Sequence, residues 1–173
     1  MKLYRVKIGP IAHDVIQTLN DTALIEVDPE KRQEAELDLV AIMEEYLRRD
    51  SALREAVREN MSAHNIPYEQ YGKVRSKMAE EWGHPTGDDV ERFLSRQMVE
   101  NFMISHFVTE VFADDKEIFK KILQILVQND VDEGALRAEA QERIQNIPEG
   151  TVDYELALNR AMKEVKKRHG LLQ

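Results

Sequence analysis

The sequence predicts an all-α protein made of two similar helical lobes, with about four helices in each. Apolar side chains recur at helical spacing, and the helix-breaking residues are rare, with 7 Gly and 5 Pro. Apolar residues make up 42% of the chain and charged residues 33%, which is typical of amphipathic helices rather than of a disordered chain. No segment of strand length alternates apolar and polar residues strictly enough to predict a β-strand. Residues 2–8 come closest, and we interpret them as extended chain or the start of a helix.

The first half of the chain is punctuated by residues that end or begin helices. An apolar helix ends near Asn20, and a short apolar connector over residues 24–27 follows it. Asp28-Pro29 then gives a cap and a proline at the first helical position. The next helices are separated by predicted breaks at Arg49–Ser51, Asn65–Pro67 and Gly83–Gly87. The last of these is the densest cluster of breakers and the candidate hinge.

The second half shows the same punctuation. An oxygen-bearing side chain stands before each apolar helical pattern, and the predicted caps are Asp88, Asp114, Asp132 and Thr151. Ile147-Pro148-Glu149-Gly150 separates the last two helices, and the final helix closes near Gly170.

Short motifs of the first half return in the same order in the second half, which indicates an internal duplication. The matched motifs are Glu26-Val27 with Glu110-Val111, Ala52-Leu53-Arg54 with Ala135-Leu136-Arg137, Ile66-Pro67 with Ile147-Pro148, and Gly83 with Gly170. We therefore predict a helical repeat over residues 1–84 and a second over residues 85–173. The two halves pack face to face or stand apart, in an elongated molecule, around the hinge.

The motifs of the second half resemble a known family. Val108-Thr109-Glu110-Val111 before a capped helix, and Ile147-Pro148-Glu149-Gly150-Thr151 before a helix with a basic end, are similar to the bacterial domain-of-unknown-function family 507. The first half resembles a second tandem copy, although it lacks the glycine after Ile66-Pro67. Thr151 and Tyr154 stand where the family has serine and tryptophan, and Ala161-Met162 where it has tyrosine. The resemblance implies helical structure and no assigned activity.

Charge and composition restrict the partners. The formal net charge is −9, which disfavours binding to nucleic acid or to anionic membranes. The basic end of the last helix (Lys163, Lys166, Lys167 and Arg168) is explained by the helix dipole. The chain has no cysteine, no signal-peptide core and no long apolar run, so we expect a cytoplasmic protein.

No pattern points to a catalytic, cofactor or metal site, so we predict none and lean towards a protein that is not an enzyme. The five histidines lack the spacing of helical metal motifs. His84 is expected to be exposed in the hinge and His106 to be buried. Glu26 and Glu110 are the candidate functional carboxylates because they recur at equivalent points. They either accept backbone hydrogen bonds or form a carboxylate site between the repeats.

The remaining functional signal is apolar surface. The stretch 98–111 is apolar on most sides, which indicates deep burial or a face covered by a partner. The candidate interaction residues are Met98, Phe102, Met103, Phe107, Tyr71 and Trp82. We therefore expect a non-catalytic protein–protein interaction module that binds another protein or a second copy of itself. The alternative is an enzyme or metal-binding protein using the carboxylate pair.

Overall fold

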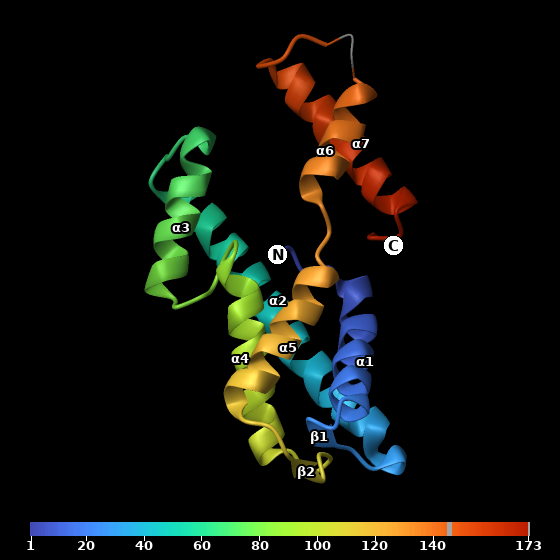
Figure 1. The fold of residues 1–173 in the computed structure, drawn as a ribbon. Helices are drawn as coiled ribbons and strands as arrows, with labels where there is room; N and C mark the ends of the chain where they lie inside the picture. Colours follow the sequence, from blue (N-terminus) through green and yellow to red (C-terminus); the bar gives the residue numbers. More distant parts are fainter. Residues whose placement is uncertain (145–146, 173) are drawn as a thin grey trace.

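The computed structural model describes residues 1–144 and 147–172, and over them the fold is all-α apart from one two-stranded sheet (Figure 1). Its α-helices are α1 (Arg5–Asp21), α2 (Arg32–Ala63), α3 (Tyr71–Glu81), α4 (Asp89–Ile104), α5 (Asp115–Gln128), α6 (Glu133–Glu142) and α7 (Val152–Arg168). Turns of 3-10 helix at Pro29–Lys31 and Tyr68–Gln70 precede α2 and α3. The predicted fold class is confirmed. No described helix is both long and apolar enough to cross a membrane.

Most of the predicted helix starts are confirmed in their capping chemistry. Four predicted cap side chains accept a hydrogen bond from a backbone amide of the turn that follows: Asp28, Asp114, Asp132 and Thr151. Asp88 is the exception. Its backbone is already helical and its side chain accepts no such bond, so this cap prediction is wrong.

The predicted break near Arg49–Ser51 is also wrong, because α2 continues through it for 32 residues. Asp50 is the reason. A capping aspartate turns its carboxylate back to a free backbone amide, whereas the Asp50 carboxylate accepts hydrogen bonds from the guanidinium groups of Arg54 and Arg75. With that carboxylate occupied by side chains, the backbone stays in the helix and links two parts of the molecule.

Three apolar cores hold these helices together. The largest lies among α1, the first half of α2, α4 and α5, and it draws buried residues from both sides of Gly83–Gly87. The second half of α2 packs on α3 through a small core, and we call this pair the α3 arm. Helices α6 and α7 pack on each other as a C-terminal hairpin. Figure 1 shows the α3 arm and the C-terminal hairpin extending from the body.

The small sheet joins the two Glu-Val motifs that are matched in the sequence. β1 (Ile25–Glu26) pairs antiparallel with β2 (Glu110–Val111), with Glu26 opposite Glu110 and Ile25 opposite Val111. The amide of Thr109 donates to the Glu26 carbonyl at 2.8 Å, and that of Phe112 to the Leu24 carbonyl at 3.0 Å. The apolar connector expected at residues 24–27 therefore contains a short strand, whose partner comes from the far half of the chain.

Tyr4 attaches the C-terminal hairpin to the body. Its ring is buried in the hairpin's core, and the ammonium groups of Lys2 and Lys166 each lie 5.5 Å from the ring centroid. Its hydroxyl donates to Glu133, which also pairs with Lys166 at 2.9 Å. Of residues 2–8, the first three thus precede α1, with Lys2 and Tyr4 docking the hairpin, and the helix begins at Arg5.

Candidate functional site

A cluster of buried polar side chains lies where α2, α3 and α4 meet. Asp50 accepts from Arg75 at 2.8 Å and from Arg54. His84, which follows α3, is 4% exposed, and its Nε2 lies 3.4 Å from Asp50 Oδ1. Tyr46 stacks on the imidazole with ring centroids 4.9 Å apart and donates its hydroxyl to the carbonyl of Pro85.

His84 is held in this cluster by the end of α3. Gly83 adopts a positive φ of 57°, a conformation that glycine adopts without a Cβ penalty. The amide of His84 then donates to the Ala79 carbonyl at 2.8 Å and closes the helix. The turn directs the imidazole inward, so the prediction that His84 is exposed in the hinge is wrong.

Each group of the cluster has a settled protonation state near neutral pH. Burial lowers the pKa of His84 despite the nearby Asp50 carboxylate, and burial raises the pKa of Tyr46 to about 12. Burial opposes ionisation of Asp50 as well, but the charges and hydrogen bonds of Arg54 and Arg75 outweigh it and lower its pKa. A neutral imidazole, a neutral phenol and a carboxylate are therefore present together.

A groove of about 380 Å³ runs beside this cluster between α2 and α4. Ile42, Tyr46 and Phe93 give it apolar and aromatic walls, and Ala41 on α2 leaves space beside them. Asp38 and Asn101 lie at one end and His84 at the other. The volume is within the range of natural ligand-binding sites, which combine apolar walls with a few polar groups.

Two residues that line this groove, His84 and Asn101, carry buried polar atoms without hydrogen-bond partners among the described residues. Neither ring nitrogen of His84 meets hydrogen-bond geometry with any residue that the structure describes, and the same holds for the buried Oδ1 of Asn101. A buried polar group without a hydrogen bond costs about 1–3 kcal/mol. A ligand that displaced the covering side chains and offered hydrogen bonds to these atoms would recover that cost.

Two large apolar side chains are exposed at the Asp38 end of the groove. Leu37 on α2 is 55% exposed and Ile104 on α4 is 75% exposed. The hydroxyl of Ser105 donates to Asp38 at 2.8 Å, which brings the end of α4 against this part of α2. The groove is therefore a shallow channel between two helices with an apolar edge, rather than an enclosed cavity.

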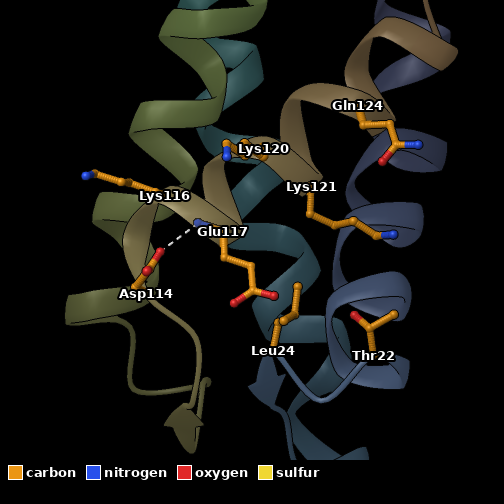
Figure 2. A pocket seen from close by; sticks show the side chains of 8 residues that line it. All are labelled: Thr22, Leu24, Asp114, Lys116, Glu117, Lys120, Lys121 and Gln124. Atoms are coloured by element: carbon orange, nitrogen blue, oxygen red, sulfur yellow. Dashed lines mark hydrogen bonds between the residues drawn. The ribbon is translucent and has the colours of Figure 1, made fainter.

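A second depression lies between the end of α1 and the first turns of α5, with a volume of about 620 Å³ (Figure 2). Lys116, Lys120 and Lys121 line it, and Asp114 caps α5 beside them through the bond drawn to Glu117. Figure 2 shows Lys116 and Lys121 pointing in opposite directions. Because the ammonium groups do not converge, this depression is not a built anion site.

The candidate carboxylates Glu26 and Glu110 are brought together, since they are register partners in the small sheet. Both are exposed. Within residues 1–144 and 147–172, no group of three or more His, Cys, Asp or Glu side chains is placed to hold a metal ion. The function of this pair stays a prediction.

The candidate interaction residues divide between core and surface. Met98 and Phe102 are buried in the body's core, so they cannot contact a partner; their spacing of one helical turn places them on the inner face of α4. Phe107 and Tyr71 are half-buried, whereas Met103 and Trp82 are exposed. His106, expected to be buried, is exposed in the loop after α4.

Sequence reasoning missed the groove residues. Tyr46, Phe93 and Asn101 lie in segments whose apolar periodicity is that of any amphipathic helix, so nothing in the pattern distinguishes them. One signal was available: Ala41 is a small side chain one turn after the apolar Leu37, which makes a gap on the outer face of α2.

The fold and groove together define a helical protein with a groove on a four-helix body, to which the α3 arm and the C-terminal hairpin are attached. The chain belongs to the family described as "Protein of unknown function (DUF507)", whose model matches residues 1–171. The match spans the chain as a single unit, so it does not divide the chain into the two tandem copies that the motifs predict. No curated protein matches the chain.

Proposed function

We propose that this protein is a non-catalytic helical module that binds another polypeptide, with the groove between α2 and α4 as its binding site. The observation that carries the proposal is the combination of aromatic walls with the unpaired polar atoms of His84 and Asn101. An amphipathic helix that binds between two helices makes this kind of contact, with apolar anchors spaced by one turn.

The protonation states support binding rather than acid–base catalysis. A general acid or base is most effective when its pKa lies near the working pH. The raised pKa of Tyr46 and the lowered pKa values of His84 and Asp50 move each group away from that range. Because their protonation does not change near neutral pH, the same groups are well suited to act as fixed hydrogen-bond donors and acceptors.

We further infer that the chain arose by internal duplication and works in the bacterial cytoplasm. The paired strands bring the two Glu-Val motifs into register. Gly83 and Gly170, which are matched in the motifs, both follow a helix end with positive φ and similar closing bonds. The absence of cysteine is consistent with a reducing compartment.

Site-specific photo-crosslinking in cells tests the binding site. A benzophenone side chain at Ala41 lies in the groove, and the matched control is the same side chain at the exposed Ala138 of α6. We expect a discrete protein adduct from position 41 that position 138 does not give. Substituting His84 by Gln, or Asn101 by Leu, should weaken that adduct. No adduct at position 41, or equal adducts at both positions, contradicts the proposal.

A further inference from the structure

The outer face of α7 carries exposed apolar side chains and cations that could occupy the groove. Val152 and Leu156 are large apolar side chains on an exposed face, 77% and 53% exposed, and they lie one turn apart. Arg160 and Lys163 continue the same stripe towards the end of the helix. Neither cation forms an ion pair with any residue within the described ranges.

The groove offers the complementary surface. Ala41 leaves a gap between the apolar edge at Leu37 and the walls at Tyr46 and Phe93. Asp38 accepts a hydrogen bond from Ser105, yet it has no cationic partner among the residues that the structure describes. A helix that placed a leucine over Ala41 and a cation four residues later could meet Asp38.

We propose that the occupant of the groove is the α7 helix of a second copy of this chain. This inference rests on the proposed function and names its partner. Running antiparallel to α2, α7 would place Leu156 over Ala41, Val152 against Tyr46 and Phe93, and Arg160 beside Asp38. The one-turn spacing of Val152, Leu156 and Arg160 matches that of Glu45, Ala41 and Leu37 along α2.

Unpaired charges of opposite sign on the two surfaces support this occupant over others. Asp38 gains a cation and Arg160 gains a carboxylate, while the apolar pair on α7 leaves water. Since one chain carries both surfaces, each of two copies can place its α7 in the groove of the other. A two-fold axis would make the two contacts equal.

Sedimentation equilibrium of the full chain measures the self-association. We expect a mass above the 20.1 kDa of one chain that increases with concentration. Ala41→Arg and Leu156→Arg each change the outer surface of a helix, and each should weaken association by about tenfold or more. Ala138→Arg, the same substitution on the outer face of α6, should leave it unchanged.

A charge exchange tests the pairing itself. Asp38→Arg and Arg160→Asp should each weaken association, and the double variant should restore it if the two residues meet. Circular dichroism of each variant verifies the helical fold, and a double variant no stronger than the single ones contradicts the pairing.

The results separate this inference from the function on which it rests. A single-chain mass up to millimolar concentration, together with an adduct of another protein at position 41, overturns the second copy but keeps the groove as a binding site. A single-chain mass with no adduct overturns both.

Discussion

The buried cluster around Asp50 determines how single residues respond to pH. His84 is neutral in the folded protein because burial lowers its pKa, whereas in the unfolded chain its imidazole has the ordinary pKa of about 6.5. Below that pH the unfolded state binds more protons than the folded state, so protonation favours unfolding. The stability contributed by a neutral His84 is therefore present above about pH 6.5 and lost as the pH falls towards the lower pKa of the folded state.

The first prediction concerns that pH dependence. Between pH 7 and pH 5, the free energy of unfolding of the wild-type protein should fall more steeply than that of His84→Gln, which has no imidazole to protonate. Urea unfolding at several pH values measures both slopes. His106→Gln is the matched control, because His106 is exposed, and its slope should follow the wild type. Parallel slopes for all three proteins would show that His84 does not titrate differently on folding.

Glu26 and Glu110 give a second prediction at this scale. They are directly opposite each other in an antiparallel pair, and like charges in such positions destabilise a sheet. Glu26→Gln should raise the free energy of unfolding by roughly 0.2–1 kcal/mol at low salt, as should Glu110→Gln, and the double variant should gain less than their sum. Glu55→Gln on the exposed side of α2 serves as the control.

Added Mg²⁺ or Ca²⁺ makes the same variants a test of the alternative role. A cation site built on the two carboxylates would stabilise the wild type alone when the ion is added. If the ion affects wild type and variants equally, the pair is only a source of repulsion.

The contacts within the buried cluster explain why the roles of its residues were hard to predict from the sequence. Asp50 has the local pattern of a helix cap, and its true partners Arg54 and Arg75 come from its own helix and from α3. His84 stands among breakers that favour exposure, yet the turn at Gly83 directs it inward. Both outcomes also depend on packing between helices, because Arg75 of α3 binds the Asp50 carboxylate and Tyr46 of α2 stacks on the His84 ring.

Capping chemistry is where the sequence predicts the elements well. Asp114, Asp132 and Thr151 each satisfy backbone amides in their own first turn, which is a local interaction. The sheet could not be predicted in this way, because two residues per strand have no periodicity, and the partner strand is more than 80 residues away. Local signals thus predict helix boundaries, and pairing between halves needs the folded body.

Ser51 tests the continuity of α2. It is exposed in the middle of the helix, where a proline removes a backbone hydrogen bond and clashes with the preceding turn. Ser51→Pro should therefore cost about 3 kcal/mol or more, whereas Ser51→Ala should be nearly neutral. If a new helix began at Asp50, a proline at Ser51 would occupy the tolerated first position. Chemical denaturation followed by circular dichroism compares the two variants.

For the whole molecule, the three cores are joined by few contacts. The C-terminal hairpin meets the rest of the chain through Tyr4 and Val6, which pack in and against its core, and through the ion pair between Lys2 and Glu133. Regions with small cores and few contacts open more readily than the body of a protein. We therefore expect the hairpin to open before the four-helix body.

Tyr4→Ala should release the hairpin. Its loss removes an aromatic side chain from the hairpin's core and leaves Glu133 without the tyrosine hydroxyl. Hydrogen exchange should speed up across α6 and α7, with little change in α1, α4 and α5. Tyr68→Ala is the matched control, because Tyr68 is 80% exposed. Uniformly faster exchange throughout the chain would mean that the cores unfold together.

The uninterrupted course of α2 has a mechanical consequence. At 1.5 Å per residue its 32 residues form a lever about 48 Å long. One portion walls the groove, and the other packs on α3, whose C-terminal end leads to His84 in the groove wall. A ligand that moved the groove-lining portion of α2 away from α4 would displace the far end of the helix by a larger distance. Occupancy at one place would thus be transmitted to another by rigid displacement, without a joint between them.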